Sequence, residues 1–187
     1  MEPVTLTTER LILRAPNAAD IDAITTACQD PEIPRWTPIP NPYSRADAEG
    51  FVTFVADAWA DTSETIWGMY ADGKLIGMIG LHQIAEHFAG GRADLGYWVV
   101  ASARGTGYLT EAARAVIDWG FSELGLARIH WQAVAGNIAS ARAARALGFR
   151  YEGLLRQAMT SPRGRDDGWM AGLLREDDRS PVHWPVL

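Results

Sequence analysis

The sequence predicts a single α/β (α+β) domain, in which a mostly antiparallel sheet carries helices on its faces. Strand-like and helix-like stretches follow one another in the order β-α-α-β-β-β-α-β-α-β-β, which gives about seven strands and about four helices. The 187 residues contain no internal repeat, low-complexity segment or linker. Residues 1–187 are therefore expected to form one domain, with a core of about residues 7–176 and a C-terminal tail of residues 177–187.

The first half of the chain is expected to hold one strand, two helices and a hairpin. Arg10–Ala15 alternates polar and apolar residues, as a strand does, and Asn17–Cys28 reads as a capped helix. The five prolines of Asp30–Tyr43 predict a stiff, extended loop without regular structure. Ser44–Trp59 begins with a capping box and continues as a helix. Thr65–Ile84 carries Asp-Gly between two strand-like runs, which predicts an antiparallel hairpin.

The second half is expected to alternate strands and helices, with a turn at His87–Gly91 before the first strand. The predicted elements are a strand at Ala93–Val100, a helix from about Thr110, a strand at Arg128–Val134, a helix at Ile138–Leu147, and strands at Phe149–Met159 and Trp169–Leu174. Thr160–Gly168 is expected to be a polar loop, and Arg179–Leu187 a loose tail.

A strand, a glycine loop and a helix start form the most informative stretch, Leu95–Ala115. Leu95–Val100 is apolar throughout, and the Arg104-Gly105-Thr106-Gly107 segment cannot continue that strand. Thr110 offers an N-cap hydroxyl to the helix that follows. Free N–H groups at a helix N-terminus attract anions, and missing side chains let a phosphate approach the backbone. The stretch therefore predicts a diphosphate-containing cofactor at Arg104–Thr110.

Two common phosphate-binding motifs do not match this loop. A Walker loop requires Lys and Ser/Thr after its glycine, and here Gly107 is followed by Tyr108 and Leu109. A dinucleotide fold requires a third glycine near Thr110. Glu111 would repel a pyrophosphate unless it faces away from the loop, so we leave it out of the predicted site.

Composition narrows the class of protein further. A net charge of −6 argues against a nucleic-acid partner, and no apolar run is long enough for a membrane helix. The N-terminal stretch lacks the features of a secretory signal, and the single Cys28 fits a reducing cytoplasm. Cys28 is expected in the core rather than as an acyl carrier. His82, His87 and His130 show no metal-ligand spacing, so no metal is predicted.

A second segment, about thirty residues after the loop, points to one cofactor. It runs Asn137-Ile138-Ala139-Ser140-Ala141-Arg142 and is followed by Leu147-Gly148-Phe149. Together with the glycine loop and the opening T-x-R-L-x-L-R of Thr8–Arg14, it resembles the GNAT superfamily of acyl-CoA-dependent N-acetyltransferases. Within that superfamily the chain is most similar to the ribosomal-protein alanine and serine N-acetyltransferases. The resemblance implies the GNAT fold, with a splayed strand pair at the cofactor site, and acetyl-CoA as co-substrate.

The resemblance also implies roles for individual residues. The loop would wrap the coenzyme A pyrophosphate, and the end of the preceding strand would offer backbone partners to the pantetheine and thioester. Asn137 would hold the pantetheine arm, Ser140 would lie near the thioester sulfur, and Arg142 would lie near the ribose phosphate. The loop residues concerned are Arg104, Gly105, Thr106, Gly107 and Tyr108, and the strand residues are Val99 and Val100.

The chain departs from the family pattern at several positions. Many members carry a tyrosine general acid where this chain has Ala144, which leaves Ser140 as the substitute. Some ribosomal-protein acetyltransferases carry a carboxylate where this chain has Met159. Asp94 stands where some members have a base that acts through water, although an ion pair with a nearby arginine is the commoner explanation for such a residue.

The acceptor is predicted to be a primary amine, attacked directly in a ternary complex. A protein N-terminal α-amino group, with a pKa near ~7.7–8.0, needs less help from a base than a lysine amine, near ~10.4. Trp36, Trp67 and Trp169 are candidates for the acceptor groove. A small-molecule amine or antibiotic, a CoA-binding regulatory protein without transfer activity, and a nucleotide-binding module remain alternatives. An exposed strand edge could also support a homodimer.

Overall fold

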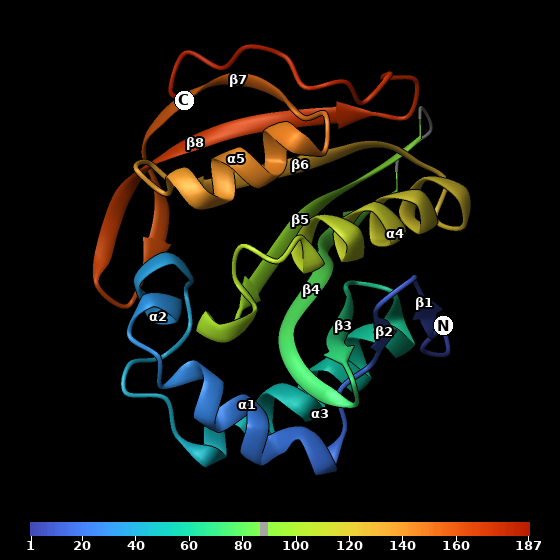
Figure 1. Cartoon of the computed structure of the whole chain (residues 1–187), viewed down its shortest axis with the longest axis vertical. Coiled ribbons are helices and arrows are strands. Elements are labelled where there is room, and N and C mark those ends of the chain that lie inside the picture. The colour runs from blue at the N-terminus through green and yellow to red at the C-terminus, as the bar shows by residue number, and fades with distance from the viewer. Residues whose placement is uncertain (87–89) are drawn as a thin grey trace.

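The computed structural model describes residues 1–86 and 90–187, and its centre is an eight-stranded sheet in the order β1-β2-β3-β4-β5-β6-β8-β7 (Figure 1). The strands are β1 (Leu6–Thr7), β2 (Ile12–Arg14), β3 (Thr65–Ala71), β4 (Lys74–Ala85), β5 (Gly91–Val99), β6 (Leu126–Val134), β7 (Arg150–Ser161) and β8 (Gly164–Leu174). The α-helices are α1 (Ile21–Cys28), α2 (Glu32–Trp36), α3 (Arg45–Asp61), α4 (Tyr108–Ser122) and α5 (Ile138–Ala146). The mixed sheet confirms the predicted fold class. The predicted turn at His87–Gly91 includes residues outside the described ranges.

The N-terminal third differs from the prediction in two places. A short β1 pairs with β2 ahead of the expected first strand, with Leu6 opposite Leu13. The proline-rich stretch is not wholly irregular, because Glu32–Trp36 forms α2. Pro31 is the N-cap of this helix and Pro34 lies in its first turn. The N–H groups of a first turn have no intrahelical partner, so proline costs little there.

The core is dominated by tryptophans from three elements. The rings of Trp59 on α3, Trp67 on β3 and Trp119 on α4 lie 4.9–5.9 Å apart, centroid to centroid. Trp67 is fully buried, and its Nε1 donates to the Val4 carbonyl. A smaller cluster packs Cys28 with other residues of α1 and with the start of α3. None of the described helices has the length and hydropathy that crossing a membrane requires.

The C-terminal third is more regular than predicted. Thr160–Gly168 is not a loop, because β7 and β8 continue through it and pair up to Ser161 opposite Gly164. The tail is not loose either. Trp184 has no exposed surface, packs against Trp131 with ring centroids 5.5 Å apart, and donates its Nε1 hydrogen to the Phe149 carbonyl at 3.1 Å. The buried indole anchors the tail to the core.

The parallel pairing in the middle of the sheet ends early. Strands β5 and β6 pair only from Gly91 opposite Leu126 to Asp94 opposite His130. Beyond that point β5 pairs with β4 alone and β6 with β8 alone. Figure 1 shows the two strands starting side by side and separating toward their C-terminal ends. This gap is the splayed strand pair that the resemblance implied.

Candidate active site

One edge of the gap is the far half of β5. The Val100 N–H donates to the Ile76 carbonyl at 2.9 Å and is therefore committed to β4. Backbone groups of an antiparallel strand alternate between its two sides, so the peptide groups of Tyr97 and Val99 face the gap. The prediction that Val100 offers its N–H to a ligand is wrong for this reason. The same role for Val99 stays a prediction, and its carbonyl already accepts Arg104 Nε at 3.0 Å.

The glycine loop lies at the mouth of the gap and leads into α4. Gly107, with φ +85°, is the N-cap, so the helix begins at Tyr108 and not after Thr110 as predicted. Glycine adopts this left-handed conformation at little cost, which is why the sequence needs it there. Within the described part of the chain, the backbone N–H groups of Gly105, Thr106 and Gly107 donate no hydrogen bond. Such N–H groups at the positive end of a helix are suited to a phosphate.

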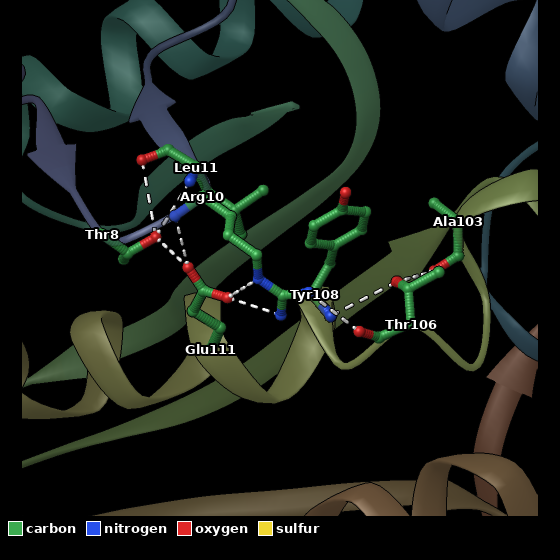
Figure 2. A network of polar contacts seen from close by, with 7 residues as sticks. All are labelled: Thr8, Arg10, Leu11, Ala103, Thr106, Tyr108 and Glu111. Carbon is green, nitrogen blue, oxygen red and sulfur yellow. Dashed lines mark hydrogen bonds and ion pairs between the residues drawn. The ribbon is translucent and has the colours of Figure 1, made fainter. Parts of the chain in front are cut away.

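An arginine from the N-terminal hairpin clamps this loop from behind (Figure 2). Arg10 donates through Nη1 to the Thr106 carbonyl at 3.1 Å and through Nε to Glu111 Oε2 at 2.6 Å. Glu111 also accepts from the Thr8 hydroxyl at 2.6 Å. Burial alone would raise the pKa of Glu111, but the bonds from Thr8 and Arg10 lower it overall. Glu111 thus points away from the loop and keeps its charge on the side of Arg10.

The clamp decides where one loop N–H points. The Thr106 carbonyl and the Gly107 N–H belong to the same planar trans peptide unit, so they point in opposite directions. Because Arg10 holds the carbonyl on its own side of the loop, the Gly107 N–H is directed to the side away from Arg10. The Arg10 guanidinium also lies 4.5 Å from the Tyr108 ring centroid. Our sequence analysis quoted Arg10 in the family motif but gave it no role. Arg10 lies far from the loop in the sequence, so no local pattern indicates this contact.

The side chain of Arg104 is engaged within the protein. Its guanidinium pairs with Asp30 at 2.8 Å and with the Val99 carbonyl. The loop therefore offers backbone N–H groups rather than this charge. Arg142 is exposed on α5 and forms no ion pair within the described residues. Its predicted role at the ribose phosphate stays a prediction.

The side chains of Tyr97, Trp131 and Ser140 meet over the gap, on the α5 side of the sheet. Asn137 caps α5 by accepting from the Ser140 N–H at 3.2 Å, as expected of a helix N-cap. Ser140 Oγ lies 2.9 Å from the Tyr97 hydroxyl and 3.0 Å from Trp131 Nε1. The sequence indicated Ser140 as a site residue but gave no indication of a role for Tyr97 or for the buried Trp131. Burial raises the pKa of Tyr97, against the effect of its bonds to Ser140 and Trp131, so the phenol stays protonated.

Asp94 lies at the apex of the gap, on the opposite sheet face. It is three residues from Tyr97 along β5, and an odd separation puts side chains on opposite faces. Asp94 Oδ1 lies 3.2 Å from His130 Nδ1, without hydrogen-bond geometry. Burial and the nearby Arg128 hold the pKa of His130 below its usual value despite Asp94, so this imidazole is neutral at pH 7. The alternative reading of Asp94, an ion pair with an arginine, is wrong, because the structure provides a histidine as its neighbour. The role of Asp94 as a base stays a prediction.

Two of the three predicted acceptor-groove tryptophans are wrong. Trp67 is fully buried between α3 and α4, and Trp169 is only 9% exposed. Trp169 pairs with Ala133, two residues from Trp131, so it shares the α5 face and belongs to the core. Trp36 is half-buried on α2 and stays a candidate. Its Nε1 donates to Glu32, and the Arg35 guanidinium lies 4.6 Å from its ring centroid.

Comparison with known proteins matches this arrangement to one family. Residues 10–150 match the model of the acetyltransferase (GNAT) domain. The chain belongs to the GNAT acetyltransferase family. It is an acyl-CoA-dependent N-acetyltransferase, and its relatives carry corresponding names. The uncharacterized N-acetyltransferase YoaA of Bacillus subtilis is 35% identical over 156 residues, which cover 82% of this chain and 87% of YoaA.

Solved structures of the family share the fold. The crystal structure of a probable acetyltransferase has a TM-score of 0.83 and 27% sequence identity, and the match covers 93% of this chain and 98% of that one. Mycobacterium smegmatis RimJ in complex with CoA-disulfide has a TM-score of 0.86 and 20% identity, with 94% of this chain and 91% of that one covered. The predicted GNAT fold is confirmed.

Proposed function

We propose that this protein transfers the acetyl group of acetyl-CoA to the α-amino group of a protein N-terminus. The observation that carries the donor half is the gap between β5 and β6, with the unpaired loop N–H groups at its mouth. The peptide groups of Tyr97 and Val99 can pair with a pantetheine arm as with an added strand. The loop N–H groups would then receive the pyrophosphate.

The transfer is direct rather than through an acyl-enzyme. Cys28 is the chain's single cysteine and is only 3% exposed in the cluster of α1. Burial raises the pKa of its thiol to about 12, so almost no thiolate forms at neutral pH. Asp94 and Ser140 flank the gap from opposite faces of the sheet. An amine approaching from the Asp94 side and a sulfur leaving toward Ser140 therefore fit one ternary complex.

Two observations support an α-amine over a lysine amine. The groups at the apex are the Asp94 carboxylate and the neutral His130 imidazole, and neither type of group is as basic as a lysine amine. At pH 7.5 roughly a quarter to two-fifths of an α-amine is already neutral, compared with roughly a thousandth of a lysine amine. Among the relatives is the putative ribosomal N-acetyltransferase YdaF of Bacillus subtilis, 35% identical over 101 residues that cover 54% of each chain.

A matched pair of peptides tests this proposal. One peptide has a free N-terminus and blocked lysines, and the other has a blocked N-terminus and free lysines. With acetyl-CoA present, CoA release and mass spectrometry should show acetylation of the first peptide only. If small amines such as aminoglycosides are acetylated and neither peptide is, the acceptor is a small molecule and not a protein N-terminus. No thermal stabilisation by CoA or acetyl-CoA would overturn the donor half as well.

A further inference from the structure

A hydrogen-bonded triad spans the gap just beyond the point where β5 and β6 separate. Tyr97 comes from β5, Trp131 from β6 and Ser140 from the first turn of α5. Trp131 Nε1 lies 3.1 Å from the Tyr97 hydroxyl and 3.0 Å from Ser140 Oγ, and the two hydroxyls are 2.9 Å apart. Tyr97 and Ser140 are half-buried, whereas Trp131 is 1% exposed. The triad is thus anchored in the core at one end and open toward the gap at the other.

The hydrogens of this triad can be counted. The indole of Trp131 can only donate, and each hydroxyl has one hydrogen and two lone pairs. If Tyr97 and Trp131 both donate to Ser140 Oγ, both of its lone pairs are filled and its own hydrogen is left over. Tyr97 can instead donate to the Ser140 carbonyl at 3.3 Å, and Ser140 then donates to Tyr97. Rotation of one phenol hydrogen therefore switches the Ser140 hydroxyl between an internal partner and the gap.

We propose that Tyr97 and Trp131 are positioning residues that turn the Ser140 hydroxyl into a hydrogen-bond donor for the departing thiolate of CoA. This inference rests on the proposed function, because it needs the thioester to lie in the gap. As the amine nitrogen bonds to the acetyl carbon, the C–S bond breaks and its electron pair stays on sulfur. Ser140 stabilises that charge by a hydrogen bond without losing its proton. The proton that the amine gives up restores the thiol, so atoms and charge balance.

Several features fit this role better than simple packing. Tyr97 is a phenol at neutral pH, as tyrosines usually are, and burial raises its pKa further, so it can donate to Ser140. Ala144 has no exposed surface and no polar group to offer, so α5 carries no second acid at that position. Trp184 packs behind Trp131 at 5.5 Å and limits movement of the indole. A charged sulfur in a partly desolvated gap gains more from such a fixed donor than it would from water.

The test compares Ser140→Ala and Tyr97→Phe with the wild type. We expect kcat to fall about a hundredfold for Ser140→Ala, the usual scale for loss of one aimed donor. For Tyr97→Phe we expect a fall of about tenfold, because Ser140 then keeps only one donor. KM for acetyl-CoA should change little, since the triad acts on the leaving sulfur. The matched control is Tyr151→Phe, which removes a hydroxyl from a half-buried tyrosine outside the triad.

A second readout separates positioning from folding. Bound CoA is titrated through the ultraviolet absorbance of its thiolate. The thiol pKa should be lower in the wild type than in Ser140→Ala or Tyr97→Phe, and equal in the wild type and Tyr151→Phe. Unchanged kcat and unchanged thiol pKa in Tyr97→Phe, with CoA still bound, would overturn this inference and leave the proposed function standing. Failure of the wild type to bind CoA at all would overturn both.

Discussion

The cofactor loop (residues 101–107) and the junction of α2 with the β7–β8 turn are held in different ways. Besides the distant contacts from Arg10 and Asp30, the loop is held by its neighbours in sequence. Thr106 Oγ1 donates to the Ala103 carbonyl at 2.7 Å, and Arg104 reaches the Val99 carbonyl five residues away. The junction depends on one distant side chain, because Arg163 in the β7–β8 turn donates to the backbone carbonyls of Pro34 and Arg35.

This difference explains which half of the reaction the sequence reveals. Contacts between residues close in sequence need particular residue types at fixed spacings, and these form a motif. A junction held through backbone carbonyls accepts almost any residue at the positions contacted, so it leaves no pattern there. Figure 1 shows the β7–β8 hairpin curving toward α2, the helix that carries Trp36. Under the proposed function we therefore expect the acceptor to be recognised at this junction and the donor at the loop.

The strongest test of the loop is Gly107→Val, which should raise the Kd for CoA more than about a hundredfold. A β-branched residue avoids the left-handed conformation that Gly107 holds at φ +85°, so the loop must rearrange and its N–H groups turn away. Isothermal titration measures the loss, and circular dichroism checks the fold. Gly50→Ala is the control, because the added methyl meets nothing within 4 Å on α3. Unchanged affinity in Gly107→Val would disprove the loop assignment.

A smaller effect is expected from the clamp behind the loop. Arg10→Met should weaken CoA binding about tenfold, because the Thr106–Gly107 peptide loses the bond that orients it. Glu111→Gln should weaken binding less, and the double variant should resemble Arg10→Met, since both act through one network. Arg114→Met removes the same charge from an exposed site on α4 nearby and separates a general charge effect. Additive effects in the double variant would contradict the clamp.

Local chemistry made much of the fold predictable. The capping box of Ser44 and Asp47, the Asn137 cap and the hairpin at Asp72-Gly73 all form as their residues indicate. The N-cap of α4 was misplaced because Thr110 is a good cap by residue type, whereas the left-handed Gly107 ends the loop first. A proline count predicted no helix at Glu32–Trp36, since it ignores that a first turn tolerates proline.

The rest required knowing which strands lie side by side. Tyr97, Trp131 and Ser140 are separated by 9 to 43 residues, and only the sheet order and the divergence of β5 from β6 bring them together. The burial of Trp67 likewise depends on Trp59 and Trp119, from helices on either side of it in the chain. Residue type alone cannot tell a core tryptophan from one that lines a groove.

The smallest effect is expected from Arg163→Ala, which tests the contrast between the donor half and the acceptor half of the site. Without its guanidinium the β7–β8 turn loses its bonds to the carbonyls of Pro34 and Arg35, and the turn can move away from α2. KM for the amine acceptor should rise about three- to tenfold, while the Kd for acetyl-CoA stays unchanged. Steady-state kinetics with the acceptor varied, together with titration of acetyl-CoA, separate these quantities.

Arg156→Ala is the control, because Arg156 is exposed on the same strand pair and forms no ion pair within the described residues. Equal changes for donor and acceptor would mean that the junction supports the whole site, and the division between the two halves would have to be abandoned.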